Sequence, residues 1–307
     1  MPSVKDLSIA YLGLGIMGGA MAANLAKAGA RVSGFNRTAG KPGVEAAAQG
    51  GVCIVSKIAD TVKEAAIIFT CLGDEHDVLD VLAQEVCKHA KPGAIVIDTT
   101  TIGPEAARRA AAILQSSGIH FLDAPVTGGD IGARQGTLTI LVGGDEADFN
   151  AAKPALEAVG KRIFHCGPVG AGQAMKLCNQ ILCAVNMLAV SEALSFADEL
   201  GISQDLLIQS LSEGAGGSWA LANLGTRIAR KEFGPGFMLK HMLKDLRLVE
   251  SSVDKTLPAA EMAKELFEQA AGLDYPERPA DEQGTQAMFR VYSEGKAGQL
   301  SKAKGQS

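Results

Sequence analysis

The chain has 307 residues, of which 47% are hydrophobic and 21% are charged, and its formal net charge is -5. This length and composition indicate a soluble globular protein with room for two domains, and they exclude an intrinsically disordered chain. The acidic balance and the lack of a basic block argue against nucleic acid as a main partner.

The six cysteines lie mostly inside apolar runs and form no CxxC pair, which predicts reduced, buried thiols rather than disulfides. The five histidines are scattered without metal-ligand spacing, so we expect no metal site. The sequence shows no signal peptide, no transit peptide and no run of 18 apolar residues free of polar ones. We therefore expect a cytoplasmic protein that does not bind a membrane.

A glycine fingerprint lies near the start of the chain. Residues 7–12 form a short apolar run that predicts a buried strand, and residues 19–29 read as a helix ended by glycine. Between them the spacing GxGxxG provides Gly13 for a tight turn, Gly15 for close approach of a pyrophosphate, and Gly18 for helix packing. The fingerprint alone is a weak signal, but strand, glycines and helix together predict a dinucleotide site. The predicted cofactor loop is Gly13, Leu14, Gly15, Ile16, Met17 and Gly18.

The next predicted strand, residues 31–35, ends at Asn36, Arg37 and Thr38. In NAD-binding proteins an acidic residue here usually binds the ribose 2′-hydroxyl. Asn36 carries no charge that would repel a 2′-phosphate, whereas Arg37 can pair with one and Thr38 can donate to it. These three residues predict a preference for NADP; the alternative is an ordinary solvated turn that contains an arginine.

The strand–helix alternation continues and predicts a parallel sheet. Gly73 and Asp74 follow one of the strands and Thr99, Thr100 and Thr101 follow the next, at the strand ends where ligands bind in open parallel sheets. We also expect two further strands, one over 136–143 at the sheet edge and another over 163–166. The predicted strands are 65–72, 94–98 and 120–123, and the predicted helices are 76–89 and 104–117.

Thr127, Gly128 and Gly129 follow the strand that ends at Asp123. One hydroxyl and consecutive backbone N–H groups suit a carboxylate or phosphate. The alternative is a simple turn that precedes the next strand.

The stretch from Gly170 to Leu200 predicts a long and largely apolar helix, because it is rich in Ala, Leu and Met and contains no proline. Lys176, Asn179 and Gln180 lie at i, i+3 and i+4, so they share one face of this helix. A buried lysine is costly unless it is paired or used in chemistry. These residues alone leave open a catalytic group and a structural polar cluster at a domain junction.

Strand patterns disappear after this helix and helical patterns follow one another, so we expect a second domain that is helical. Trp219, the only tryptophan, follows a glycine-rich turn and would ordinarily be a core residue. Lys240, Lys244 and Asp245 lie on one of the helices, where charges usually mark a solvated face. The predicted helices are 204–213, 219–231, 239–254, 259–271 and 281–294, and we expect residues 295–307 to be frayed.

Four segments together resemble the β-hydroxyacid dehydrogenases: GLGIMGGAMAANL, DAPVTGG with GTLTILVGG, GAGQAMKLCNQ and the late MLKDL. This group includes 3-hydroxyisobutyrate dehydrogenase, tartronate semialdehyde (2-hydroxy-3-oxopropionate) reductase and the glyoxylate and succinic semialdehyde reductases. The resemblance covers nearly the whole chain in the right order. It implies an α/β Rossmann domain over 1–168, a long interdomain helix over 169–200, and an all-helical C-terminal domain over 201–307 that commonly builds a homodimer or homotetramer.

The resemblance also implies roles for individual residues. Lys176 corresponds to the catalytic lysine, and the substrate carboxylate would lie against Thr127, Gly128 and Gly129. The remaining substrate-binding positions would be Asn179, Gln180, Trp219 and Asp245, and the remaining cofactor-binding positions Asn36, Arg37, Thr38, Leu72, Gly73, Thr101 and Lys244.

Two departures bear on the substrate. Most of the family has serine where this chain has Thr127, whose added methyl narrows the pocket. Many members have two asparagines where this chain has Asn179 and Gln180, so either amide could position the substrate.

The expected function is NADP-dependent hydride transfer between a small anionic aldehyde and the matching hydroxy acid. Lys176 would be the general acid/base. Candidate substrates are 2-hydroxy-3-oxopropionate, succinic semialdehyde, glyoxylate and a 3-hydroxyisobutyrate-like acid. One alternative is an imine reductase, although those enzymes generally lack the lysine; the other is a non-catalytic NADP-binding scaffold.

Overall fold

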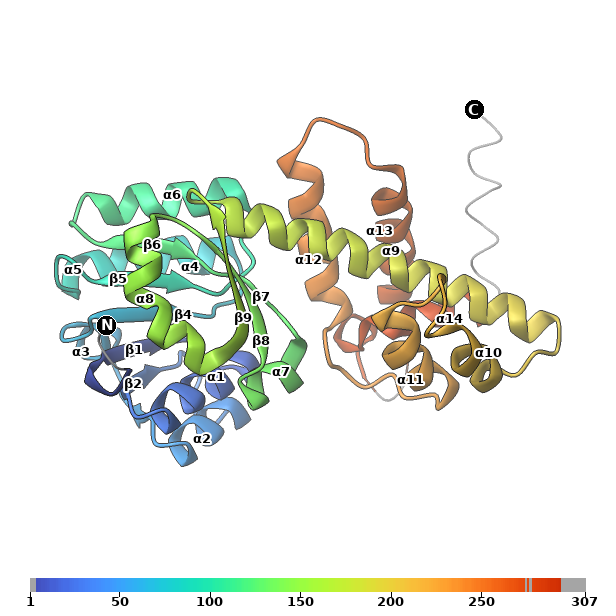
Figure 1. The fold of residues 1–307 in the computed structure, drawn as a ribbon, viewed down its shortest axis with the longest axis horizontal. Helices are drawn as coiled ribbons and strands as arrows, with labels where there is room; N and C mark the ends of the chain where they lie inside the picture. The colour runs from blue at the N-terminus through green and yellow to red at the C-terminus, as the bar shows by residue number, and fades with distance from the viewer. Residues whose placement is uncertain (1–3, 274, 276–277, 294–307) are drawn as a thin grey trace. The chain divides into compact units, whose positions relative to one another are not determined.

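The computed structural model describes residues 4–273, 275 and 278–293. The chain divides into two compact units, residues 1–176 and residues 177–307 (Figure 1). The first unit is an α/β Rossmann domain and the second is helical, as expected. The predicted fraying of 295–307 lies outside the described residues.

The first unit is built on one nine-stranded sheet in the order β3-β2-β1-β4-β5-β6-β8-β7, with β9 paired to β8. The strands from β3 to β6 are parallel, which is the arrangement that the strand–helix alternation predicts. The strands are β1 (Ser8–Leu12), β2 (Arg31–Phe35), β3 (Cys53–Ile54), β4 (Ile67–Thr70), β5 (Ile95–Asp98), β6 (His120–Asp123), β7 (Val126–Thr127), β8 (Leu138–Gly143) and β9 (Gly160–Gly167).

Helices cover both faces of this sheet (Figure 1). Alternate residues of β1 point to opposite faces, so Ile9 and Tyr11 belong to one core cluster, and Ala10 and Leu12 belong to another. The first cluster joins the sheet to α1, α2, α7 and α8, and the second joins it to α3, α4 and α6. These helices are α1 (Ile16–Lys27), α2 (Pro42–Gln49), α3 (Ile58–Val62), α4 (Glu75–Val81), α6 (Pro104–Gln115), α7 (Gly129–Gln135) and α8 (Glu146–Val159).

The central strands end in register at their carboxyl ends, on the same side of the sheet. Leu12 pairs with Thr70, Thr70 with Asp98, and Asp98 with Asp123. The loops that follow these residues therefore emerge side by side, which places the predicted cofactor loops together.

The expectation of an edge strand over 136–143 is wrong. β8 lies inside the sheet, because it pairs antiparallel with β6 and β7 and parallel with β9. β9 is longer than the predicted 163–166 and pairs along the whole of β8.

The helix expected over 76–89 forms, but a π-helical turn, η2 (Leu82–Val86), lies between α4 and α5 (Cys87–His89).

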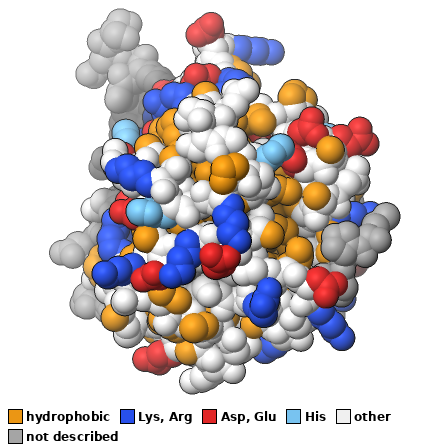
Figure 2. All heavy atoms as spheres, turned by 90° about the vertical axis from the view of Figure 1, so that its left-hand side faces the viewer, with side chains coloured by type: hydrophobic (Ala, Val, Ile, Leu, Met, Phe, Trp, Pro, Cys, Tyr) orange, Lys and Arg blue, Asp and Glu red, His pale blue; other side chains and the backbone are white. Residues whose placement is uncertain are grey.

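Positive and negative charges are mixed on the surface: Figure 2 shows basic and acidic side chains interspersed over one face of the molecule. Exposed ion pairs of the described residues include Lys91–Glu64 and Arg108–Glu105.

The second unit has one core, formed by α9, α12, α13 and the short helices around them. The single helix expected over 281–294 is wrong in its described part: η4, η5 and α14 replace it. Gly284 forms an isolated bridge with Met238, and Leu239 N–H donates to the Gln283 carbonyl, so tertiary pairing interrupts the helix. The elements are α10 (Gln204–Leu211), η3 (Ala220–Gly225), α11 (Thr226–Ala229), α12 (Leu239–Ser252), α13 (Pro258–Ala271), η4 (Ala280–Glu282), η5 (Thr285–Met288) and α14 (Phe289–Ser293).

Helix α9 (Ala171–Glu199) begins in the first unit and continues into the second. By length and composition it is the one helix of the described residues that could span a membrane. Its buried residues Ala184, Met187, Val190 and Leu194 belong to the core of the second unit, which is the usual place of such a helix in a globular protein.

The prediction of buried cysteines is wrong. The six cysteines all lie in the described part of the chain and form no disulfide there; Cys53, Cys178 and Cys183 are exposed and the other three are partly exposed. The reason is their place in the fold: Cys53 lies on a two-residue outer strand, and Cys178 and Cys183 lie on the outward side of α9.

Candidate functional site

The glycine loop has the shape that a dinucleotide requires. Gly13 has φ 95°, and a side chain there would clash with the Cys71 carbonyl oxygen. A side chain on Gly18 would clash with the Gly13 carbonyl oxygen, so only glycine allows α1 to pack this closely on the loop. A Cβ on Gly15 would meet no atom within 4 Å. Gly15 therefore presents open backbone at the N-terminus of α1, where a pyrophosphate would lie against helix N–H groups.

The end of β2 supports this loop. Asn36 Oδ1 accepts from Leu14 N–H at 2.8 Å, and Asn36 Nδ2 donates to the Thr38 carbonyl at 2.7 Å. The neutral amide thus holds the glycine loop against the turn. The Arg37 side chain is 83% exposed, and its guanidinium pairs with the Asp77 carboxylate at 3.1 Å.

Asp77 was not singled out by its sequence pattern, because the carboxylate comes from α4, forty residues later. A side chain on Gly73 would lie 2.6 Å from Asp77 Oδ2. Asp77 therefore lies beside both a predicted cofactor loop and the predicted phosphate-binding arginine.

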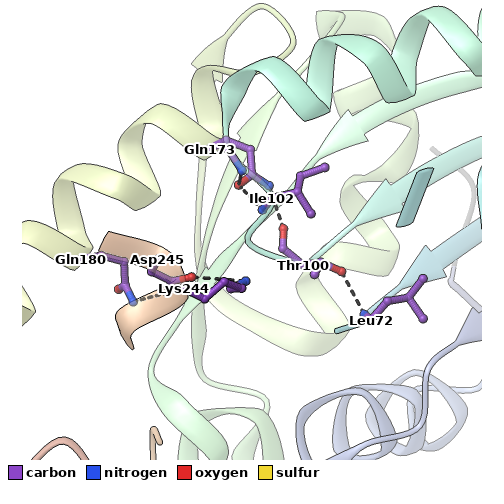
Figure 3. Close-up of polar contacts among 8 residues, drawn as sticks. Leu72, Thr100, Ile102, Gln173, Gln180, Lys244 and Asp245 are labelled. Atoms are coloured by element: carbon purple, nitrogen blue, oxygen red, sulfur yellow. Dashed lines mark hydrogen bonds and ion pairs between the residues drawn. The ribbon is translucent and has the colours of Figure 1, made fainter. Parts of the chain in front are cut away.

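Two loops at the sheet edge are tied by threonine and aspartate. Leu72 N–H donates to Thr100 Oγ1 at 2.9 Å (Figure 3). Thr100 N–H and Thr70 Oγ1 donate to Asp98 Oδ1 at 3.1 and 2.7 Å. Asp98 is fully buried, and burial raises the pKa of its carboxyl to about 6 although these bonds oppose the shift.

Asp123 caps the start of α9. Its two carboxylate oxygens accept from Gly170 N–H at 2.7 Å and Gln173 N–H at 2.8 Å. Side chains on Gly143 or Gly172 would crowd this carboxylate. Burial raises the pKa of Asp123 against the effect of the backbone N–H donors. The motifs DAPVTGG, GTLTILVGG and GAGQAMKLCNQ therefore meet at the Asp123 carboxylate, which fixes the first turn of α9.

The Gln173 side chain connects the first turn of α9 to the loop that contains the predicted cofactor residue Thr101. Its Nε2 donates to the Thr100 carbonyl at 2.8 Å, and its Oε1 accepts from the N–H groups of Ile102 and Gly103 at 3.0 and 3.1 Å (Figure 3). The side chain is fully buried. Lys176 follows one helical turn later and is 7% exposed.

The Thr127-Gly128-Gly129 stretch combines a strand end and a helix start. Thr127 ends β7 and is half-buried, Gly128 is the N-cap of α7, and Gly129 is its first residue. The two glycines have φ 129° and 63°, and a Cβ on Gly129 would meet no atom within 4 Å. The stretch therefore presents exposed backbone next to a hydroxyl, as an anion clamp requires.

In the second unit, Gln180 and Asp245 form a buried pair in which Gln180 Nε2 donates to Asp245 Oδ2 at 2.6 Å (Figure 3). Asn179 Nδ2 donates to Gln180 Oε1 at 2.8 Å. Lys244 Nζ lies 3.3 Å from Asp245 Oδ1, an ion pair that lacks hydrogen-bond geometry. Gln180 thus orients Asp245, whereas the half-buried Asn179 has the greater access to a ligand.

Trp219 is 71% exposed, so it does not occupy the core position that is ordinary for a tryptophan. It directly precedes the π-helix η3, and its carbonyl accepts from Asn223 Nδ2 at 3.0 Å. Its indole is available for contact.

Two family models match the chain. The NAD-binding domain of 6-phosphogluconate dehydrogenase matches residues 8–167, and the NAD-binding domain of NADP-dependent 3-hydroxyisobutyrate dehydrogenase matches residues 170–292. The chain belongs to the β-hydroxyacid dehydrogenase family. It is therefore an NAD(P)-dependent oxidoreductase that acts as a hydroxyacid dehydrogenase.

Relatives within this family align over almost their whole length. An uncharacterised oxidoreductase of Synechocystis is 48% identical over 289 residues, which are 93% of this chain and 98% of the relative. The 2-hydroxy-3-oxopropionate reductase of Escherichia coli is 40% identical over 271 residues, which are 86% of this chain and 91% of that enzyme. The structure of Mycobacterium tuberculosis 3-hydroxyisobutyrate dehydrogenase with L-serine has a TM-score of 0.83 at 34% identity and covers 93% of this chain and 98% of that one.

Proposed function

We propose that this dehydrogenase transfers hydride between NADP(H) and a small carboxylate-bearing aldehyde or its 3-hydroxy acid. The observation that carries the proposal is Lys176, a buried lysine on a helical turn that Asp123 and Gln173 anchor to the cofactor domain. Substrates of this class include 2-hydroxy-3-oxopropionate, succinic semialdehyde, glyoxylate and 3-hydroxyisobutyrate. The names of the E. coli reductase and of the M. tuberculosis dehydrogenase support this class.

The cofactor, Lys176 and the Thr127-Gly128-Gly129 stretch each have a separate role in the proposed reaction. When bound, the nicotinamide cofactor supplies or accepts the hydride. The Lys176 ammonium stabilises the negative charge that develops on the carbonyl oxygen and donates a proton to it; in the reverse direction the neutral amine accepts that proton. The Thr127 hydroxyl and the N–H groups of Gly128 and Gly129 hold the substrate carboxylate, which fixes the orientation of the reacting carbon.

Five side chains of the second unit are the remaining substrate and cofactor residues that we propose. Asn179 and Trp219 contact the substrate, and Gln180 orients Asp245. Lys244, paired with Asp245, contacts the cofactor. The supporting observation is that the four polar side chains among them form one connected network.

The cofactor preference is NADPH over NADH. Arg37 provides an exposed guanidinium, and no carboxylate ends β2. The cradle at Gly13, Gly15 and Gly18 fits the pyrophosphate that both cofactors share, so the choice depends on Arg37 and its neighbours.

We further propose a cytoplasmic homodimer or homotetramer. The support is an apolar stripe on the outward side of α9 and α10, where Leu182, Phe196, Leu200 and Leu206 are exposed. Large exposed apolar residues at helical spacing usually mark an interface.

A substrate panel tests the function. Reduction of glyoxylate, succinic semialdehyde, 2-hydroxy-3-oxopropionate and methylmalonate semialdehyde is measured with NADPH and with NADH, and oxidation of 3-hydroxyisobutyrate and serine with NADP and NAD. We expect turnover of at least one aldehyde acid, faster with NADPH. Turnover of a cyclic imine and of no aldehyde acid would replace the proposal with an imine reductase, and cofactor binding without any turnover would contradict it.

A further inference from the structure

The fully buried Gln173 side chain makes three hydrogen bonds, all to the backbone of one loop, Thr100–Gly103. The backbone N–H of Gln173 donates to Asp123 Oδ2 at the end of β6. Such a complete set of partners fixes the glutamine in one rotamer and one orientation of its amide, since exchanging Oε1 and Nε2 would break all three side-chain bonds.

The loop that Gln173 holds leads directly to the cofactor residues. Thr100 accepts from Leu72 N–H through its Oγ1, and its carbonyl accepts from Gln173. Thr101, the predicted cofactor contact, lies between the residues that Gln173 binds. A single side chain thus links the loops of two strands to the first turn of α9 (Figure 3).

Lys176 lies three residues after Gln173, on the next turn of the same helix. The rise of one turn is only about 5.4 Å, so a helix held at Gln173 has little freedom at Lys176. A displacement of about 1 Å at a reacting group can cost on the order of 10²-fold in rate.

We propose that Gln173 is a positioning residue that sets the Lys176 ammonium relative to the cofactor loop. This inference rests on the proposed function, and it assigns to Gln173 no contact with substrate or cofactor. Gln173 acts through the helix turn on one side and the Thr100–Gly103 loop on the other.

Two substitutions test the linkage. Gln173→Met keeps the length of the side chain and removes all three hydrogen bonds. Gln173→Glu keeps an acceptor for Ile102 and Gly103, but it donates to the Thr100 carbonyl only when the carboxyl is protonated. Burial raises the pKa of such a carboxyl from its ordinary value of about 4.3.

The turnover of each variant is measured from about pH 5 to pH 9, a range that spans the titration of a buried glutamate, and divided by that of the wild type at each pH. We expect Gln173→Met to lower kcat by about tenfold or more at every pH, with a smaller change in the KM for NADPH. Gln173→Glu should lose turnover at high pH, where its ionised carboxylate faces the Thr100 carbonyl without a proton to donate, and recover toward the wild type as the pH falls. A merely structural loss would not produce this recovery.

Gln286→Met is the matched control. Gln286 is also buried, and its Nε2 donates to the carbonyls of Glu232 and Gly234 at 2.9 and 3.2 Å. We expect it to lower the melting temperature while its activity ratio stays independent of pH. Wild-type turnover in Gln173→Met, or a flat ratio in Gln173→Glu, would overturn the role of Gln173; no turnover by the wild type with any panel substrate would overturn the proposed function itself.

Discussion

We propose that Arg37 decides between NADPH and NADH. Its guanidinium is exposed and pairs with Asp77, an interaction that contributes little to stability at such an exposed position. A 2′-phosphate offers a stronger, bidentate partner, so binding of NADPH would exchange one anion for another. Asp77 is then a competitor that the phosphate must displace.

We predict that Arg37→Ala raises the Kd for NADPH by about 10- to 100-fold, because a charge-assisted hydrogen bond contributes about 1.5–3 kcal/mol. The Kd for NADH should change far less. Isothermal titration with both cofactors measures this, and Arg31→Ala, at the opposite end of β2, is the matched control. An equal loss of affinity for NADH and NADPH would contradict the assignment.

At the scale of elements, the glycine loop and α1 could be predicted from sequence because each glycine has a local reason. Gly13 requires a positive φ, Gly18 requires close packing, and Gly15 faces open space. The residue type at the end of β2, Asn36, could be predicted from sequence to matter for the same reason. The absence of an acidic residue there is a property of the sequence alone.

The capping of α9 could not be predicted in the same way. Asp123 and Gly170 are far apart in sequence, and no periodicity reveals that the carboxylate of one accepts from the N–H of the other. The same holds for Gln173 and Asp77, whose partners come from other elements. The errors at the sheet edge and after residue 280 also come from tertiary pairing, of β9 with β8 and of Met238 with Gly284.

Substitutions at two glycines of the loop should affect protein stability and cofactor binding separately. We predict that Gly18→Ala destabilises the protein by about 1–3 kcal/mol, because the new methyl would clash with the Gly13 carbonyl. Gly15→Ala should leave the melting temperature within a few degrees of wild type, since its methyl meets no atom within 4 Å, yet raise the Kd for NADPH by about tenfold or more. Thermal melts and cofactor titrations measure both effects. Normal NADPH affinity in Gly15→Ala would show that the cofactor does not lie on this loop.

At the scale of the whole molecule, the division into a cofactor domain, a separate interdomain helix and a helical domain at residues 168 and 200 stays a prediction. What the fold does show is that α9 carries Lys176 and two of the exposed apolar residues, Leu182 and Phe196. The same helix could therefore serve chemistry at one end and assembly along its length.

We predict that Phe196→Glu lowers the oligomeric state, because a charge within a buried apolar interface is costly. Light scattering coupled to size-exclusion chromatography compares it with the wild type, and Glu199→Gln, also exposed on α9, is the control. A wild-type protein that is monomeric at all concentrations would contradict the proposed assembly. An unchanged oligomer in Phe196→Glu would place the interface elsewhere.

We propose Lys176 as the general acid/base, and the turnover of Lys176→Ala is the measurement that tests this role. The variant and the wild type are compared with NADPH and the best aldehyde acid of the panel, after the Kd for NADPH has shown that the cofactor site is intact. We expect kcat to fall on the order of 10²-fold or more while the Kd for NADPH stays almost unchanged. Turnover close to that of the wild type would contradict it.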